Sequence, residues 1–161
     1  MTTKQQVKDL LHDESRAIPE RMAAVRDLPG VSGPVQQLLD ESWEQQDWDT
    51  FELAVIAGFE GPDTSMTRVL CTALESGQPA VPTEDVLMLL ADVKDPESTE
   101  TLRRVLEDPP EWDEFYQTSR KSIWALAAIG TPRAREILEA ARDNGHEFVR
   151  EWAGDELSRW Q

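Results

Sequence analysis

The chain of 161 residues contains 32 Asp and Glu against 16 Lys and Arg, a formal net charge of -16 at pH 7. This length suits one domain that buries about 70% of the surface of its unfolded chain. The charge repels nucleic-acid phosphates and anionic membranes and favours encounter with a basic protein, although solubility alone would also account for it.

Few residues offer metal or disulfide chemistry. Cys71 is the single cysteine and His12 and His146 are the two histidines, so neither a disulfide within the chain nor a zinc site is expected. The N-terminal residues lack the apolar region of a signal peptide, and no apolar run approaches the roughly 20 residues of a membrane helix. We expect a cytoplasmic protein with no cofactor and no membrane contact.

Two short helices are predicted at the start of the chain. The first covers residues 3–13, with Thr3 as a possible N-cap. The second covers residues 19–28 and turns Ala23 inward together with its apolar neighbours. Residues 1–30 are therefore expected to cap one end of a stack of helices, a role that terminal repeats need because one of their faces meets water.

Beyond residue 30, a proline recurs at the start of each amphipathic run. Proline suits the first turn of a helix because its missing N–H has no partner there. The intervals of 28, 34 and 36 residues match two helices and two turns each. The four prolines are Pro34, Pro62, Pro96 and Pro132, and they divide the chain into helical pairs at 34–60, 62–94, 96–130 and 132–160.

Each pair contains a second break, and strand signals are scarce. The first helices are predicted at 34–45, 62–76, 96–107 and 132–143. The second helices are predicted at 48–59, 83–93, 112–129 and 147–160. We expect an all-α fold, a right-handed α-solenoid of roughly ten helices that forms a single domain over residues 1–161.

The last part of the chain, residues 119–160, contains one pattern twice at helical spacing. Its members are Arg120, Ile123 and Ala127, which recur as Arg150, Ala153 and Leu157. A turn at Gly130, Thr131 and Pro132 lies between the two copies.

This stretch resembles HEAT-like (armadillo-type) helical repeats, whose second helix opens on Val-Arg, as at Val149 and Arg150 here. The resemblance implies an α-solenoid. It also implies that Arg120 and Arg150 are structural and reach an acid of the neighbouring repeat, for which Glu151 and Asp155 are candidates.

Acidic residues gather at the start of the predicted second helices. Equivalent positions of stacked repeats align, so these acids would form a ridge along one edge of a solenoid. Acids in a first helical turn also complement the helix dipole, which explains them without any partner. The acids are Asp47, Asp49, Glu52, Glu84, Asp85, Asp113, Glu114 and Glu147.

Three of the six tryptophans, Trp43, Trp48 and Trp112, are flanked by acids. Partly exposed Trp among carboxylates suits an interface that captures Lys or Arg by cation–π contact and ion pairing. The alternative is that each of these rings packs inward between repeats. The other three are expected in the core or sealing the last repeat: Trp124, Trp152 and Trp160.

Catalysis has little support in the sequence. It contains no Gly-rich phosphate loop, and the histidines accompany no recognisable nucleophile motif. His146 precedes a predicted helix as a cap or solvent residue, and Cys71 lies in an apolar run as an expected core thiol. We expect a protein that is not an enzyme.

The sequence favours a protein-binding helical-repeat protein with a basic partner. The most concrete hypothesis is an inhibitor or immunity-type protein that neutralises a basic, nucleic-acid-acting toxin by occupying the surface of its anionic substrate. One alternative is a scaffold or chaperone-like subunit with a non-electrostatic groove. A remote alternative is a HEAT-like lyase or repair-related enzyme, of which a form that acts on nucleic acid would need a basic concave face.

Overall fold

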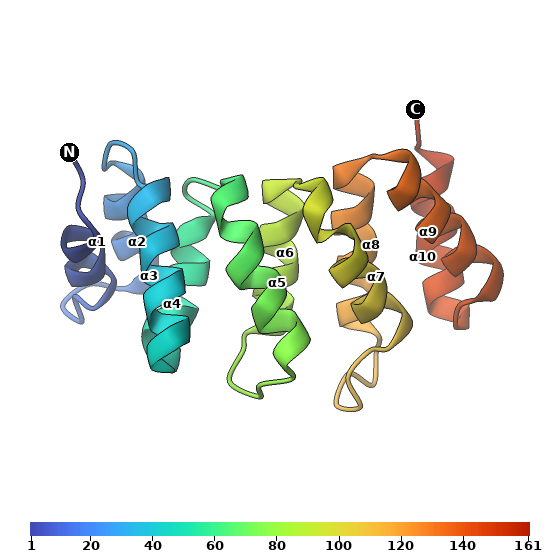
Figure 1. Ribbon diagram of the computed structural model, residues 1–161, viewed down its shortest axis with the longest axis horizontal. Helices are drawn as coiled ribbons and strands as arrows, with labels where there is room; N and C mark the ends of the chain where they lie inside the picture. Colours follow the sequence, from blue (N-terminus) through green and yellow to red (C-terminus); the bar gives the residue numbers. More distant parts are fainter. The chain divides into compact units, whose positions relative to one another are not determined.

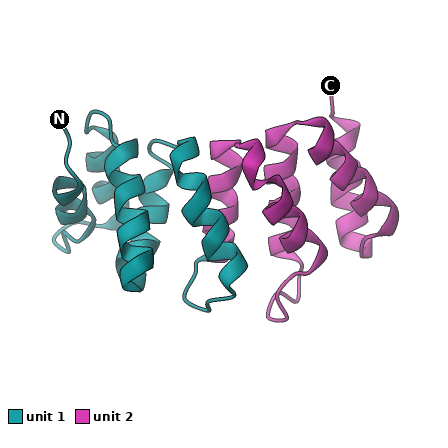
Figure 2. Cartoon of the chain, viewed as in Figure 1, with its two compact units in different colours: residues 1–82 teal, residues 83–161 magenta.

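The computed structural model describes residues 1–161, which form α-helices joined by turns (Figure 1). The helices divide into two compact units, residues 1–82 and 83–161 (Figure 2). Unit 1 contains α1 (Lys4–Leu11), α2 (Ile18–Arg26), α3 (Ser32–Gln45), α4 (Trp48–Gly58), the 3-10 turn η1 (Thr64–Met66) and α5 (Thr67–Ser76). Unit 2 contains α6 (Thr83–Val93), the 3-10 turn η2 (Pro96–Ser98), α7 (Thr99–Glu107), α8 (Gln117–Ile129), α9 (Pro132–Asn144) and α10 (Glu147–Ser158).

The fold is all-α and of the α-solenoid class, as the sequence predicts. Most helix boundaries fall within a few residues of their predicted positions, but two helices begin later than predicted. The helix predicted at 62–76 begins at Thr67, after the 3-10 turn η1, and Pro62 lies outside it. The helix predicted at 112–129 begins only at Gln117, so residues 108–116 form a loop. The single-domain organisation and the right-handed sense remain predictions.

In unit 1, α3 and α4 pack antiparallel and α1 lies against both. The burial of Val7 and Leu11 from α1 against this pair explains how a short N-terminal helix is held in place. Met22 and Val25 of α2 are buried, but Ala23 is exposed, which corrects the prediction that it turns inward. The largest fully buried side chains of α3 and α4 are Leu38, Leu39 and Phe51.

Side-chain caps fix the ends of several helices in unit 1. Thr3 caps α1 in a reciprocal capping box with Gln6, which confirms the cap predicted from the sequence. Asp63 accepts a hydrogen bond from the Ser65 amide at 2.9 Å and so begins η1. Such caps satisfy amide groups that have no partner within the helix, so each helix start is defined by the sequence itself.

Helix α8 is the centre of unit 2, because α6, α7, α9 and α10 all pack against it. A helix with neighbours on several sides needs small or apolar residues around much of its circumference. Ile123, Ala125 and Leu126 are accordingly fully buried. The same helix follows the loop 108–116, so the position of that loop is set by the core of the unit.

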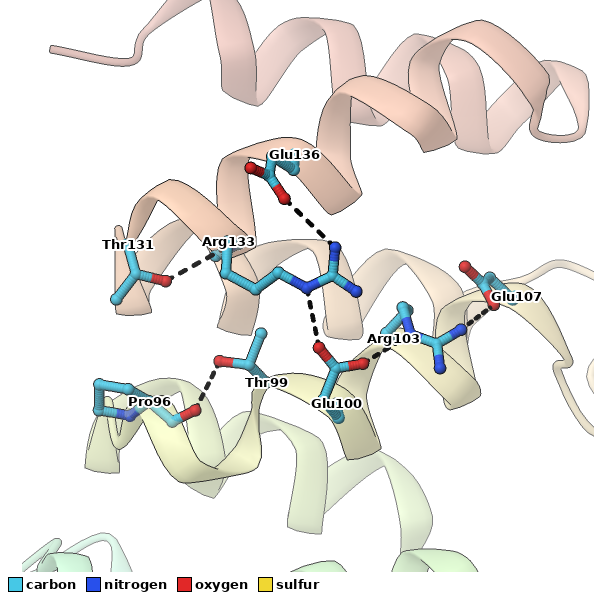
Figure 3. Close-up of polar contacts among 9 residues, drawn as sticks. Pro96, Thr99, Glu100, Arg103, Glu107, Thr131, Arg133 and Glu136 are labelled. Carbon is cyan, nitrogen blue, oxygen red and sulfur yellow. Dashed lines mark hydrogen bonds and ion pairs between the residues drawn. The ribbon is translucent and has the colours of Figure 1, made fainter.

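Glu100 of α7 joins α7 to α9 through two arginines (Figure 3). Its carboxylate accepts hydrogen bonds from Arg133 Nε of α9 at 2.8 Å and from Arg103 Nε of its own helix at 2.8 Å. Arg133 also contacts Glu136, and Arg103 also contacts Glu107. These contacts with Arg133, and then Arg103, lower the pKa of the Glu100 carboxyl to about 2.

We expect the Glu100 carboxyl to titrate near pH 2 in the folded protein, well below its ordinary value of 4.5. Because the folded pKa is depressed, the stabilisation is complete above the unfolded pKa and is lost as the pH falls towards 2. Carboxyl carbon shifts followed by NMR against pH measure this. Arg133→Gln should raise the midpoint, and a wild-type midpoint at the ordinary value would contradict the network.

Candidate protein-binding site

The loop 108–116 of unit 2 is held in one conformation by the side chain of Asp113. This carboxylate accepts hydrogen bonds from the Gln117 amide at 2.9 Å, the Thr118 amide at 2.7 Å and the Thr118 hydroxyl at 2.6 Å. Asp113 is only 8% exposed, and Thr118 is fully buried. Asp113 therefore caps α8 from within the loop, and we place it in the support of the site and not on its contact surface.

Two backbone turns reinforce the loop. The Asp113 amide donates to the Pro110 carbonyl at 3.0 Å, and the Tyr116 amide donates to the Asp113 carbonyl at 3.2 Å. Tyr116 has φ 56° and lies in the left-handed region, where a residue other than Gly is strained by about 1 kcal/mol or more. The cap and the turns thus hold a backbone conformation that local preference alone would not choose.

This loop exposes large aromatic side chains. Trp112 is 61% exposed and Phe115 is 71% exposed, while Asp113 between them points into the helix start. Phe148 in the first turn of α10 is 46% exposed. Aromatic side chains are enriched in protein–protein interfaces, and Trp in particular often contributes much of the binding energy. We call Trp112, Phe115 and Phe148 the aromatic edge.

A row of aromatic contacts joins the loop to α10. Tyr116 stacks on His146 at a centroid distance of 4.3 Å, and His146 contacts Phe148 at 5.3 Å. Phe148 in turn contacts Trp152 at 6.0 Å. His146 Nδ1 accepts a hydrogen bond from the Phe148 amide at 3.4 Å, which confirms its predicted role as a cap. Phe148 is therefore fixed relative to the loop.

A hollow of about 370 Å³ lies beside the aromatic edge, between the ends of α7 and α9 and the start of α10. Gly145 permits the close approach of α9 and α10 here, because a Cβ atom would lie 2.6 Å from the Ala141 carbonyl oxygen and 2.9 Å from a Val149 methyl. Most of the lining is apolar: Leu106, Pro109, Tyr116, Ile137, Ala140 and Val149. Its size falls in the range of small-ligand pockets.

The charge around this hollow has one sign. Residues 106–116 contain five acids and no Lys or Arg, and residues 143–149 contain two acids and no Lys or Arg. Glu111, Glu114 and Glu147 are exposed. Carboxylates around an apolar surface favour a partner that presents cationic side chains around an apolar one.

The remaining predicted acids of unit 2 lie on α6. Glu84 forms an ion pair with Lys121 of α8, so its negative charge is neutralised within the unit. Asp85 is exposed and faces solvent in the first turn of the same helix. The alignment of the acids of both units along one ridge remains a prediction.

In unit 1, Trp43 and Trp48 pack together with the buried Phe51. Their ring centroids lie 5.5 Å apart, and Trp43 lies 5.6 Å from Phe51. Both tryptophans are half-buried, unlike Trp112. This arrangement matches the inward-packing alternative for Trp43 and Trp48, since each ring contacts the other and the ring of Phe51.

Trp43 also lines a polar hollow of about 480 Å³ between α3 and α5. Asp40 and Glu44 of α3 lie on its wall, and Arg68 of α5 lies opposite. Partial burial, and then the neighbouring Glu44, raises the pKa of Asp40 above its ordinary value, whereas Arg68 acts in the other direction. The wall of this hollow is therefore polar, with two carboxylates against one guanidinium, and does not offer an anchor for an apolar side chain.

Asp47 is the N-cap of α4. Its carboxylate accepts from the Thr50 amide at 3.2 Å and from the Thr50 hydroxyl at 2.7 Å. The hydroxyl of Thr50 also lies 2.9 Å from His12 Nε2, which ties α1 to the start of α4. The hydrogen bond from the Thr50 side chain lowers the pKa of Asp47. Asp49 and Glu52, by contrast, are exposed.

We expect Asp47→Ala to lower the free energy of unfolding by about 1 kcal/mol, because the Thr50 amide and hydroxyl lose their acceptor. The matched change Asp49→Ala, two residues along the chain, should alter it by less than about 0.5 kcal/mol. Urea unfolding followed by circular dichroism measures both. Equal effects would show that the cap contributes nothing.

The repeated arginines act differently from the prediction. The Arg120 guanidinium lies over the ring of Trp124 at 4.9 Å and over that of Trp152 at 5.2 Å. Arg150 Nε donates to the Arg142 carbonyl at 3.3 Å. Both contacts are structural, as expected, but the partners are aromatic rings and a backbone carbonyl and not an acid. Cation–π attraction to two rings stabilises the guanidinium without an ion pair to a carboxylate.

Two further placements concern Cys71 and the remaining tryptophans. Cys71, for which the sequence predicts an inert core thiol, is half-buried on α5. Trp124, Trp152 and Trp160 are half-buried, and Arg135 lies 6.0 Å from the Trp160 ring. The structure contains no group of three or more His, Cys, Asp or Glu side chains placed to hold a metal ion. None of its helices is both long and apolar enough to cross a membrane.

The comparisons with known proteins agree with this architecture. A family model of HEAT repeats matches residues 67–158, which is more than half of the chain. The protein therefore belongs to the HEAT repeat family, and proteins of this family commonly mediate protein–protein interactions. A search of curated proteins gives no match. The aromatic edge, the loop 108–116 and the hollow beside them all lie within the matched residues.

Proposed function

We propose that this protein is a non-enzymatic binding protein that captures a basic partner protein on the aromatic edge of unit 2. The observation that carries the proposal is the loop 108–116, which presents Trp112 and Phe115 on a fixed backbone. Every charged residue of this loop is an acid. Rigid aromatic anchors bind with little loss of conformational entropy, and the surrounding carboxylates select a cationic surface. The net charge of -16 adds long-range attraction for such a partner.

The concrete form of this function is an inhibitor of immunity type. A nucleic-acid-acting toxin needs a basic surface to hold phosphates, and an acidic protein that covers this surface blocks its substrate. The contact surface would comprise the aromatic edge with Glu111, Glu114 and Glu147. The exposed Asp49, Glu52 and Asp85 would contribute attraction at longer range. Neither a nucleic acid nor a membrane is expected as partner, because both carry negative charge.

A scaffold that binds its partner through an apolar groove is the second candidate, and the apolar lining of the hollow favours it. Salt separates the two functions. Binding to a basic partner should weaken steeply as ionic strength rises, whereas binding in an apolar groove should barely respond.

The test is capture of partners from a native lysate at low and at high salt, with identification by mass spectrometry. The site variant carries Glu111→Gln, Glu114→Gln and Glu147→Gln. The control variant carries Glu14→Gln, Asp92→Asn and Asp155→Asn, which are also exposed and leave the same net charge. A basic protein released by salt, retained by the control and lost by the site variant is the expected result. Equal loss from both variants, or a partner indifferent to salt, would overturn the proposal.

A further inference from the structure

The hollow beside the aromatic edge is concave and has a mostly apolar lining. Binding of a partner through ion pairs alone would require neither feature. It is about 370 Å³ in volume, and the side chains of Leu106, Ile137 and Val149 form its apolar floor. These three residues are at most 5% exposed, so the floor belongs to the core of unit 2 and does not collapse when the hollow is empty.

The walls of the hollow are rigid for separate reasons. On one side Tyr116 is held in its left-handed conformation by the Asp113 cap and stacks on His146. On the other side Gly145 brings α9 and α10 so close that no larger residue fits. A preformed concave site between fixed walls binds a side chain without first having to reorganise.

The rim of the hollow determines the kind of chain that can approach it. Glu107 lies in the lining, and the exposed Glu111, Glu114 and Glu147 lie in the two segments that form its walls. Those segments contain no Lys or Arg. An apolar side chain flanked by acids would be repelled here, whereas one flanked by Lys or Arg would be attracted.

We infer that the hollow is the socket for one large apolar side chain of the partner, presented within a basic segment. Trp112, Phe115 and Phe148 belong to the two segments that form the walls of the hollow and would add apolar contact to the flanking parts of that segment, and the acids of the rim pair with its cations. This inference rests on the proposed function, because it names the segment by which the basic partner would be held. It adds an apolar selectivity that charge alone would not give.

The test uses two acetylated and amidated peptides of equal charge, Lys-Lys-Phe-Lys-Lys and Lys-Lys-Ser-Lys-Lys, with amide shifts of the labelled protein followed by NMR. We expect the Phe peptide to bind about tenfold more tightly than the Ser peptide, since burial of one large apolar side chain is involved. Its binding should shift Gly145 and Val149, and the Ser peptide should leave these two amides in place.

Ala140→Phe blocks the socket from an exposed position of α9, and Ala128→Phe places the same ring on an exposed position of α8 outside it. The blocked variant should lose the preference for Phe, and the control should keep it. Equal affinity of the two peptides for the wild type, or a preference that survives Ala140→Phe, would overturn the socket. Capture of a basic protein that depends on Glu111, Glu114 and Glu147 would still stand in that case, so the two proposals fail separately.

Discussion

Replacing Trp112 and Phe115 by Ala together is expected to weaken partner binding by at least about 30-fold, because one buried aromatic anchor commonly contributes 2 kcal/mol or more. The free energy of unfolding should stay within about 0.5 kcal/mol of the wild-type value, since both side chains are largely exposed in the free protein. Titration of the captured partner by calorimetry, beside urea unfolding, measures the two quantities.

Ile18→Ala is the matched control for the aromatic edge. Ile18 is 46% exposed on α2 of unit 1, outside the proposed contact surface. It should change neither affinity nor stability. If the double substitution left the affinity unchanged, the exposure of Trp112 and Phe115 would have no role in binding, and the site would have to lie elsewhere.

The second large effect is expected at Asp113. Asp113→Ala removes the acceptor of two amides and of the buried Thr118 hydroxyl, so the free energy of unfolding should fall by about 2 kcal/mol. The loop also loses the cap that fixes Tyr116, and partner affinity should fall because the aromatic side chains are no longer held in place.

Glu114→Ala, at the acid next to Asp113, tests contact with the partner separately from support of the loop. Glu114 is exposed and makes no hydrogen bond within the protein, so its removal should leave stability within about 0.5 kcal/mol. It should instead reduce affinity at low salt and have little effect at high salt, where surface charges are screened. If both acids lowered stability equally, or if Asp113→Ala left stability unchanged, the proposed role of the cap would be wrong.

The helical fold is predictable from this sequence because the prolines and N-cap residues that begin its helices act locally. Pro96 and Pro132 each occupy the first turn of a helical segment, and Thr3 and His146 cap the helices that follow them. These effects act over a few residues and need no knowledge of packing. The helical pairs could therefore be placed before their neighbours were known.

The start of α8 was mispredicted because the decisive contacts are specific to one loop. Apolar periodicity over 112–129 suggested a single helix, but Asp113 caps the Gln117 and Thr118 amides from outside it. Two successive prolines, Pro109 and Pro110, were the available sign that a longer loop precedes the helix. The strained Tyr116 has no sequence signature, because tertiary contacts maintain it.

The side chains of the proposed contact surface could be predicted only in part from the sequence. Trp112 is singled out because acids flank it on both sides, whereas Phe115 and Phe148 have an acid on one side only, Glu114 and Glu147, and this criterion misses them. The criterion did not distinguish Trp43 and Trp48, whose packing against Phe51 depends on how α3 and α4 meet. Burial of a ring between helices is a tertiary property, and flanking charges do not report it.

Photo-crosslinking from the aromatic edge tests directly whether the partner binds there. A benzophenone side chain at position 115, with a second variant carrying it at position 18, would be irradiated in a native lysate and the crosslinked products identified. Binding at the aromatic edge predicts a crosslink to one basic protein from position 115 and none from position 18. A crosslink to the same protein from position 18 alone, with position 115 silent, would contradict binding at the aromatic edge.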